Sequence, residues 1–537
     1  MAQTVHQVDN DLTSEWEATG FNNGRRIVRD ADGYFHMVYH SQVNPDSPPG
    51  GPCDIFYSHT ILPAPPTSSM DWVPAIPIVT LMDDDRYPSI AIEHGSTAMP
   101  GDDDTLHVVW QHYNSTTGVY DIWHISSPNA IVPPPDAWGP LSSVYTSPYN
   151  SLVPDIDCSF ANPLHVVWQE EDIEAGFSEI LYLRSLDHGV SWTNLTNISQ
   201  TPSTNSQMPD VATVIDFPDS PSQYTYWSDQ VHVVWNDDLA TSPPNIYYRS
   251  SPDAGITWNP SENVSVISGS NISDGYPSMT VSREDIPHVV WMHNVQPHDP
   301  DTPGPYVPGA DPLNPNSFPG PIAGMYAALT QEIRYSQRTG GTWIPFEVIY
   351  PTVDDQEFPS IACDQFDMLH AACQNWDGSD YEILQGHRAV SSGPWLGHEN
   401  ISFDPSHDDL FPSEATKKTA FYTEGYDMVW TKIDSDLSAG GNGQPAALSP
   451  AHEIWFAGNT SYMYVPVVND GENENVTGFF VERNPVQGGT WINTGGCCGN
   501  ISIYDLSGRT VFEHTVGTNE DGFYWNVSSA LPSGTYS

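Results

Sequence analysis

Three short sequence patterns recur in a fixed order along this chain, and this recurrence constrains the fold more than any other feature. The first pattern is an aromatic or apolar residue followed by Pro, usually Ser or Asp, and then an aliphatic residue. Its copies occupy residues 87–90, 153–156, 208–211, 276–279 and 358–361, with weaker copies at 411–413 and 26–28.

The other two patterns also occur seven times. The second is His-Val-Val-Trp, at 107–110, 165–168, 232–235 and 288–291, with looser copies at 36–39, 370–373 and 427–430. The third is an acid or Asn before Ile, at 54–55, 121–122, 179–180, 245–246, 332–333, 382–383 and 453–454. A Trp usually follows, at 72, 138, 192, 258, 343 and 395.

Each unit predicts four short strands separated by turn residues. Seven such sheets repeated around an axis predict an all-β, seven-bladed β-propeller. A straight β-solenoid is the alternative. The last strand of the ring is expected either at 461–468 or in the N-terminal stretch around Trp16.

The composition excludes several classes of function. Fifteen Lys and Arg against 68 Asp and Glu leave a net charge of −53, which repels nucleic acids and anionic membrane surfaces. No apolar stretch approaches the roughly 18 residues of a membrane span. Six cysteines are too few for a disulfide scaffold. Aromatic residues make up 12% of the chain, which indicates a folded protein rather than a disordered acidic one.

Two repeats carry a sharper motif, S-x-D-x-G-x-x-W, after the third strand. A third copy, at 336–343, has Arg338 in place of the Asp. The motif resembles the Asp-box of sialidase-type (BNR-repeat) propellers, and the resemblance covers about residues 20–468. It implies that the Asp caps a tight hairpin and that the Trp packs between sheets. The two full copies are Ser185, Asp187, Gly189 and Trp192, and Ser251, Asp253, Gly255 and Trp258.

The C-terminal part resembles a different family. Segments 479–485, 501–509 and 531–536, with Trp525 between the last two, are similar to the small β-sandwich that directs bacterial proteins to type IX secretion, a FlgD-like immunoglobulin-type module. The resemblance implies a bacterial protein that is secreted or attached to the cell surface, whose signal peptide is absent from this sequence. We expect a propeller at 1–468, a linker at 469–478 and a truncated sandwich at 479–537.

The loops that lead into the first strand of each unit are rich in carboxylates, which we expect to crowd onto one ligand-binding face. One interpretation is a solvated acidic surface. The other is binding of Ca²⁺, which takes six to eight oxygen ligands, with Asp83, Asp85, Asp354 and Asp355 as candidates. The residues expected on this face are Asp83, Asp84, Asp274, Asp354, Asp355, Asp408 and Asp409.

The sialidase resemblance also implies a catalytic set: three arginines for the substrate carboxylate, a Tyr–Glu nucleophile pair and an acid–base Asp. Arg25-Arg26-Ile27 loosely matches the start of that pattern and Arg86 is a second member, but a third site arginine is not evident. An acidic face also opposes binding of an anionic sugar. The catalytic candidates are Arg25, Arg26, Arg86, Asp85 and Glu357.

Histidines that open the second strand recur in six units, which favours a packing role, whereas His112, His293 and His407 stand outside that series. Sequons at Asn194, Asn197, Asn263 and Asn400 belong in part to a repeated strand ending. An insertion at 292–331, rich in Pro, Gly and Asp, is expected to form a lid or a partner contact.

These features favour a secreted or surface-attached module that recognises a glycan or an extracellular protein, with Ca²⁺ as its one expected cofactor. This interpretation leans against an enzyme. One alternative is a sialidase-like glycoside hydrolase or a polysaccharide lyase that uses the same acidic face. Another is an extracellular structural protein that assembles with itself, because an incomplete sandwich edge can accept a strand from a neighbour.

Overall fold

The chain forms two compact units. One comprises residues 4–420 and 426–458, and the other residues 1–3, 421–425 and 459–537. The computed structural model describes most of residues 4–293 and 331–458 together with the strands between 461 and 525. Within those spans, several loop segments, among them 9–17, 43–51, 94–103, 128–137 and 214–229, lie outside the description.

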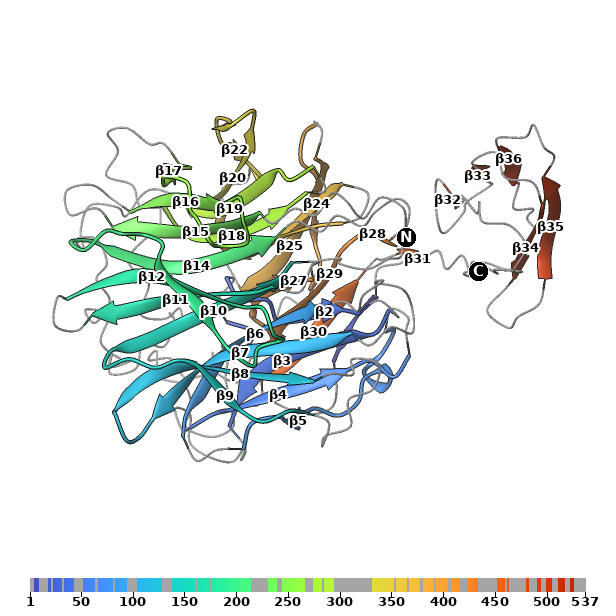
Figure 1. Ribbon diagram of the computed structural model, residues 1–537. Helices are drawn as coiled ribbons and strands as arrows, with labels where there is room; N and C mark the ends of the chain where they lie inside the picture. The colour runs from blue at the N-terminus through green and yellow to red at the C-terminus, as the bar shows by residue number, and fades with distance from the viewer. Residues whose placement is uncertain are drawn as a thin grey trace. The chain divides into compact units, whose positions relative to one another are not determined.

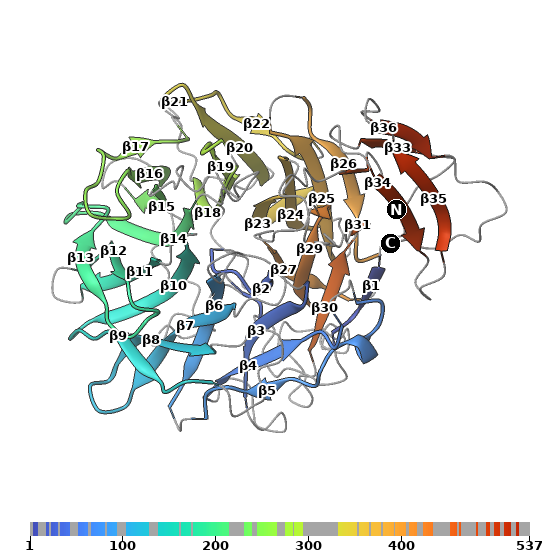
Figure 2. The ribbon, with the colours of Figure 1, turned by 45° about the vertical axis from the view of Figure 1, so that its right-hand side comes forward.

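The larger unit is a ring of seven antiparallel sheets around one axis, so the prediction of a seven-bladed β-propeller is confirmed (Figures 1 and 2). Blade 1 has β2 (Ile27–Arg29), β3 (Phe35–Ser41), β4 (Asp54–His59) and β5 (Ile76–Pro77), with a short 3-10 helix η1 (Ser69–Asp71). Blade 2 has β6 (Asp85–Glu93), β7 (Thr105–Asn114), β8 (Val119–Ser127) and β9 (Ser142–Tyr145). Blade 3 has β10 (Asn150–Cys158), β11 (Leu164–Asp172), β12 (Phe177–Ser185) and β13 (Thr193–Asn197).

The remaining blades repeat this order, with the first strand innermost. Blade 4 has β14 (Asn205–Thr213), β15 (Val231–Asp238), β16 (Asn245–Ser251) and β17 (Glu262–Asn263). Blade 5 has β18 (Asp274–Val281), β19 (Pro287–His293), β20 (Glu332–Thr339), β21 (Thr342–Trp343) and β22 (Glu347–Val348). Blade 6 has β23 (Asp355–Cys363), β24 (Met368–Trp376), β25 (Tyr381–Ala389) and β26 (Leu396–Asn400).

Blade 7 is built from both ends of the ring. It contains β27 (Asp409–Glu414), β29 (Asp427–Lys432) and β30 (Glu453–Gly458), and its outer strand is β1 (Thr4–Gln7), which pairs antiparallel with β30. Neither expected segment supplies this strand. The N-terminal part of the chain closes the ring, but through residues 4–7, while Trp16 lies outside the described residues. Within 461–468, β31 (Ser461–Tyr462) pairs with β28 (Thr423–Glu424) instead.

A proline interrupts the inner strand in six blades, and the strand accommodates it with a β-bulge. Proline cannot donate a ladder hydrogen bond, so it is tolerated in a strand only at an edge or a bulge. In each case the pairing register shifts at the proline. The residue before it has a positive φ between 43° and 56°, which costs an L-residue about 1–2 kcal/mol. These residues are Tyr87, Val153, Met208, Tyr276, Phe358 and Phe411.

The Ser or Asp after the proline joins neighbouring blades around the axis. Its side-chain oxygen is hydrogen-bonded to the inner strand of a neighbouring blade, which explains why a short polar residue recurs at this position. The bonds are Arg26 N to Ser413 Oγ (2.9 Å), Arg25 N to Ser89 Oγ (3.2 Å), Ser89 Oγ to Asp155 Oδ1 (2.7 Å), Val211 N to Asp155 Oδ2 (2.8 Å), Met279 N to Asp210 Oδ2 (2.9 Å) and Glu414 N to Ser360 Oγ (3.0 Å).

The recurrent histidines and tryptophans also serve packing between blades. In four blades the second-strand His bonds through Nδ1 to a Tyr hydroxyl on the third strand, over 2.6–2.8 Å. A Trp from the next blade then packs edge-on against the third-strand ring, with centroids 4.9–5.8 Å apart. The ring pairs are Phe456–Trp72, Tyr57–Trp138, His124–Trp192, Tyr182–Trp258, Tyr248–Trp343 and Tyr335–Trp395.

Two of the sequons lie in a structural strand ending. In Asn197-Ile198-Ser199 the Ile is buried, the Ser hydroxyl accepts the backbone N–H of Ile180, and the Asn side chain accepts the N–H of Gln200. The segment 400–402 repeats all three features. The Asn-Ile-Ser pattern therefore has a folding role in these blades.

The hairpins of the S-x-D-x-G-x-x-W motif are closed by their own side chains. Asp253 Oδ1 accepts the backbone N–H of Thr257 (2.7 Å), and the Ser251 hydroxyl accepts that of Gly255 (2.8 Å). Gly255 has φ +80°, and a Cβ there would lie 1.9 Å from the Tyr182 hydroxyl of the preceding blade. Glycine is therefore required both by the turn and by the neighbouring sheet.

The smaller unit contains β28 and β31 and five further strands. A three-stranded sheet has β32 (Phe480–Val481), β33 (Thr490–Asn493) and β36 (Gly522–Trp525), and a two-stranded sheet has β34 (Gly499–Tyr504) and β35 (Thr510–Val516). The truncated sandwich stays a prediction. Across the described residues of both units, no helix is long and apolar enough to cross a membrane.

Substituting Gly255 by Ala tests the two demands on this position. Gly176→Ala is the matched control, because Gly176 has φ +74° but open space around its Cα. We expect the control to lower the free energy of unfolding by about 1 kcal/mol through backbone strain alone. Gly255→Ala should cost about 2 kcal/mol more, because Tyr182 must move. Equal losses in urea denaturation would contradict the role of Tyr182.

Candidate functional site

Residues 18–20 and 23–26 lie near the axis of the propeller, against several inner strands. Thr19 Oγ donates to the carbonyl of Phe411 in blade 7 (3.0 Å). Asn23 Nδ2 donates to the carbonyls of Val153 and Pro209 in blades 3 and 4, at 3.2 and 2.8 Å. Two polar side chains of this axial segment thus satisfy backbone groups of three inner strands.

Arg25 and Arg26 belong to this axial segment and are buried. Arg25 Nη2 donates to the carbonyl of Met279 (3.3 Å), and the Arg26 guanidinium donates to the carbonyls of Pro88 and Gly20. Both guanidinium groups are therefore committed to the protein's own backbone. Gly24 is needed between the blades, because a Cβ there would lie 2.5 Å from Arg26 Nη1.

Buried charges surround these arginines. Burial lowers the pKa of Arg26 to about 9, and the charge of Asp155 opposes that shift. Burial raises the pKa of Asp155 and, more strongly, that of Asp210, and the charge of Arg25 opposes both shifts. The arginines offset the cost of burying carboxylates at the axis, which is a structural task.

Of the other catalytic candidates, Asp85 and Arg86 lie in blade 2 and Glu357 lies in blade 6. Arg86 donates through Nε to both carboxylate oxygens of Asp84 at 3.0 and 2.9 Å. Glu357 is buried and accepts Gln374 Nε2 (3.0 Å). Its charge acts on Tyr276, whose pKa is raised mainly by burial, the opposite of what a phenolate nucleophile needs.

Near the start of each of six inner strands, a buried polar residue faces a buried polar partner on the second strand. The identity of the pair changes from blade to blade, but each pair combines a hydrogen-bond donor with an acceptor. The cross-strand pairs are Asp85 with His112, Ser151 with Glu170, Ser206 with Asp237, Asp274 with His293, Gln356 with Asn375, and Asp409 with Lys432.

This arrangement places the residues expected on the acidic face. All seven lie just before or at the start of an inner strand, and therefore at the same end of the ring. Asp85, Asp274 and Asp409 are buried, and each faces a polar partner on the second strand of its blade. Asp83 and Asp354 are partly exposed. Two of the isolated histidines are explained: His112 Nδ1 bonds Asp85 (2.8 Å) and His293 Nδ1 bonds Asp274 (2.6 Å).

Three carboxylates of blades 1 and 2 lie close enough to interact, at the end of the ring where the inner strands begin. Burial, with the charges of Asp85 and Asp84 beside it, raises the pKa of Asp54 to about 7. Asp84 is neutralised by Arg86 and also accepts the hydroxyl of Tyr120 (2.7 Å). Asp54 therefore carries a proton up to neutral pH while its neighbours are paired.

Replacing Asp54 by Asn tests this proton. The folded-state pKa of Asp54 lies above its unfolded value, so the folded protein holds a proton that the unfolded chain releases, and stability falls as pH rises from about 4 to 7. Asp54→Asn should raise Tm more at pH 8 than at pH 5. Asp83→Asn, at the partly exposed neighbour, should show no such difference. An equal gain at both pH values for Asp54→Asn would refute the raised pKa.

Blade 6 carries an exposed aromatic side chain at the same end of the ring. Trp376, at the end of β24, is 37% exposed and packs against Tyr381 across the hairpin, with ring centroids 5.2 Å apart. Tyr381 in turn packs on Phe358 and Phe411, two of the pre-proline residues at the axis. Trp376 is thus the exposed end of an aromatic cluster whose other members, Phe358 and Phe411, are buried.

Carboxylates surround this aromatic pair. Asp355 faces Trp376 across β23 and β24, and Asp408 Oδ1 accepts the backbone N–H of Tyr381 (2.9 Å). Burial raises the pKa of Asp408, and the charge of Asp380 adds to that shift. We call Trp376, Tyr381, Asp355, Asp380 and Asp408 the blade 6 patch.

The sequence indicated Asp355 and Asp408 but not the aromatic pair. Trp376 follows a looser copy of the second pattern, and its exposure depends on hairpin geometry that spacing alone does not reveal. Asp377, expected on the same loop, lies outside the described residues, as do 294–330 of the expected lid.

In the described part of the chain, no group of three or more His, Cys, Asp or Glu side chains is arranged to hold a metal ion. Asp83 and Asp85 lie in blade 2, and Asp354 and Asp355 in blade 6. The calcium site stays a prediction.

No protein-family model matches the chain, and a search of curated proteins finds no match. Among solved structures, polysaccharide lyase Uly1 is similar over 82% of this chain and 90% of its own, with 6% identity and a TM-score of 0.44. The α-L-arabinofuranosidase Arb93A from Fusarium graminearum is similar over 72% of this chain and 98% of its own, with 11% identity and a TM-score of 0.42. Hadza microbial sialidase Hz136 is similar over 65% of this chain and 62% of its own, with 11% identity and a TM-score of 0.37.

Proposed function

We propose that this protein is a secreted or cell-surface recognition module that binds neutral glycans through the blade 6 patch. The observation that carries the proposal is the exposed Trp376, packed against Tyr381 at an interplanar angle of 55° and flanked by carboxylates. A sugar ring offers an apolar C–H face and a rim of hydroxyls. An aromatic surface beside hydrogen-bond acceptors complements both.

Charge favours a neutral ligand over an anionic one. The chain carries a net charge of −53, and the patch itself contains three carboxylates. An anionic sugar would be repelled, and the described arginines nearest the axis are bound to the protein's own groups. A neutral glycan avoids that repulsion.

The contacts near the axis support binding at the ends of the blades rather than at the centre of the ring. Thr19 and Asn23 are hydrogen-bonded to carbonyls of the inner strands there. Trp376, by contrast, ends its strand and is 37% exposed.

Alanine at Trp376 tests the proposal. On a panel of neutral oligosaccharides, the wild-type protein should bind at least one, and Trp376→Ala should weaken that binding about tenfold, equivalent to about 1.4 kcal/mol. Phe346→Ala is the matched control, because Phe346 is 41% exposed but lies between β21 and β22 of blade 5, where we expect unchanged affinity.

The same titration with and without CaCl₂ tests the expected calcium dependence. Failure of every neutral glycan to bind, or equal loss in both variants, would overturn the glycan proposal.

A glycoside hydrolase or polysaccharide lyase is the second candidate. It is favoured by two carboxyl groups of blades 1 and 2: Asp83, which is partly exposed, and Asp54, which keeps its proton up to neutral pH. Hydrolysis of a glycosidic bond uses one protonated and one ionised carboxyl group.

Measuring sugar released from neutral polysaccharides decides between the two candidates. A hydrolase should release reducing ends, and Asp83→Asn should abolish that release while Asp354→Asn, a partly exposed residue of blade 6, leaves it unchanged. Binding without release, in both the wild-type protein and the variants, would reject the enzyme.

A further inference from the structure

The interface between blades 2 and 3 differs chemically from the equivalent interface between blades 3 and 4. In blade 3, His165 bonds the hydroxyl of Tyr182, and that Tyr contacts Ala254 in the hairpin of blade 4. In blade 2 the Tyr position is His124, and the hairpin position equivalent to Ala254 is His188. A neutral contact is replaced by ionisable groups on both sides.

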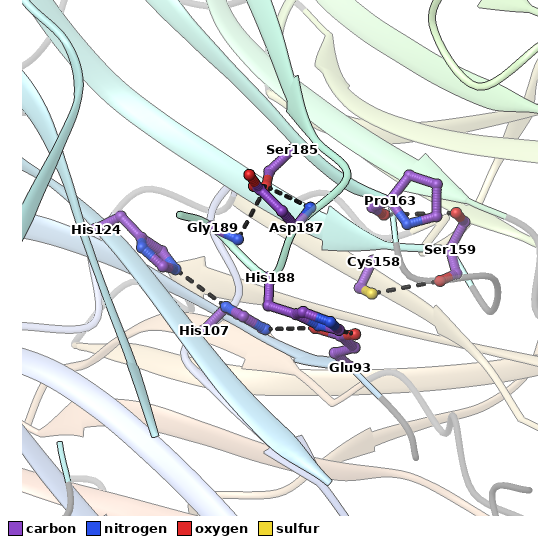
Figure 3. Close-up of polar contacts among 10 residues, drawn as sticks. All are labelled: Glu93, His107, His124, Cys158, Ser159, Pro163, Ser185, Asp187, His188 and Gly189. Atoms are coloured by element: carbon purple, nitrogen blue, oxygen red, sulfur yellow. Dashed lines mark hydrogen bonds and ion pairs between the residues drawn. The ribbon is translucent and has the colours of Figure 1, made fainter. Parts of the chain in front are cut away.

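These groups form a continuous hydrogen-bonded chain (Figure 3). His188 Nδ1 lies 2.6 Å from Glu93 Oε1, and Glu93 Oε2 lies 3.0 Å from His107 Nε2. His107 Nδ1 lies 3.0 Å from His124 Nε2, and His124 Nδ1 lies 3.3 Å from Ser142 Oγ. Only His188 is exposed to solvent, with 60% of its side chain accessible.

One tautomer set satisfies the bonds from His124 to Glu93 with neutral imidazoles. His124 Nε2–H donates to His107 Nδ1, and His107 donates through Nε2–H to the Glu93 carboxylate. His188 donates to the second carboxylate oxygen. The Ser142 hydroxyl, which donates to the His124 carbonyl (3.3 Å), also lies 3.3 Å from His124 Nδ1. Two added protons, one on each buried ring, would place two N–H groups face to face between His107 and His124.

The surroundings oppose those protons. Burial lowers the pKa of His107, and the charge of His188 adds to the effect against the opposing influence of Glu93. Burial lowers the pKa of His124 well below its ordinary value, and His107 lowers it further. The remaining nearby titratable groups have their own contacts: Asp187 is bonded within the hairpin, and Cys158 directs its sulfur to the Ser159 carbonyl.

The hairpin of blade 3 covers the buried rings. Gly189 lies against His124, where a Cβ would be 2.3 Å from Cε1, and Trp192 packs edge-on to the same ring at 5.5 Å. Movement of this hairpin, residues 185–192, away from blade 2 would uncover His124.

We propose that the Glu93–His107–His124–His188 chain is an acid-sensitive latch that holds the hairpin of blade 3 against blade 2. Because the two buried histidines have lowered pKa values in the closed state, the latch contributes its full stability above about pH 6.5 and loses it as pH falls through that value. Acidification opens the hairpin and lets both rings take up protons.

Hydrogen exchange at pH 8 and pH 5, corrected for intrinsic exchange rates, tests the latch in the wild-type chain. The amides of Gly189 and Ser191 are bonded to Ser185 Oγ and Asp187 Oδ1, and those of Gly255 and Thr257 have the same bonds in blade 4. We expect the protection of the blade 3 hairpin to fall about tenfold at pH 5, while that of the blade 4 hairpin changes less than about twofold. Equal changes in both hairpins overturn the proposal.

His124→Tyr installs the residue that blade 3 uses and removes the central titrating ring. It should abolish the pH dependence of the hairpin while leaving protection at pH 8 close to wild type. His188→Ala, which copies Ala254, removes the hairpin's bond to Glu93 while keeping both buried histidines, so it should lower protection of the hairpin at pH 8 and leave a smaller pH response. If the pH response survives in His124→Tyr, the latch assignment is wrong. If His124→Tyr does not fold, wild-type protection of the hairpin at pH 8 in His188→Ala would overturn the latch instead.

Discussion

The proline in the inner strands governs how the blades meet. Because it cannot join the ladder, each strand bulges, and the residue before the proline takes a positive φ that turns its side chain toward the neighbouring blades. Tyr276, Phe358 and Phe411 pack ring against ring, 4.8–4.9 Å apart, which offsets the strain. The Ser or Asp after the proline then links adjacent strands. One local irregularity thus supplies both an apolar ring and a hydrogen-bonded ring at the axis.

The same geometry determines where charges are buried. Because the blades converge toward the axis, the carboxylates of the inner strands lie in low-dielectric surroundings, where an unpaired charge is costly. In six of the blades a buried polar residue of the inner strand is matched by a polar partner on the second strand, as Asp85 is by His112, and Arg25 and Arg26 add buried positive charges near the axis. An excess of 53 negative charges is therefore compatible with a packed centre, and the groups left near solvent, such as Asp83 and the blade 6 patch, are those available to a ligand.

The outer parts of the blades use another repeated device. A hairpin Trp and a close glycine press on a ring of the preceding sheet, and the chemistry of that ring sets how the interface responds to its environment. Tyr182 makes the contact insensitive to mild acid, whereas His124 makes it part of a chain of titrating groups. The recognition that we propose for the loop end and the pH response that we propose for a blade interface involve separate parts of one ring.

The sequence alone determined the seven sheets, the strand order within each and the packing role of the recurrent histidines, because these depend on local patterns that every blade repeats. Closure by residues 4–7 was not predictable, since a four-residue strand carries no distinctive pattern and its partner lies about 450 residues away. The burial of Arg25 and Arg26 was not predictable either. Their position in the sequence suggested a ligand site, but in the structure both are buried and hydrogen-bonded to carbonyls of other blades. Only the tertiary structure decided which acids are paired and which aromatic ring meets solvent, because both depend on contacts between residues far apart in the chain.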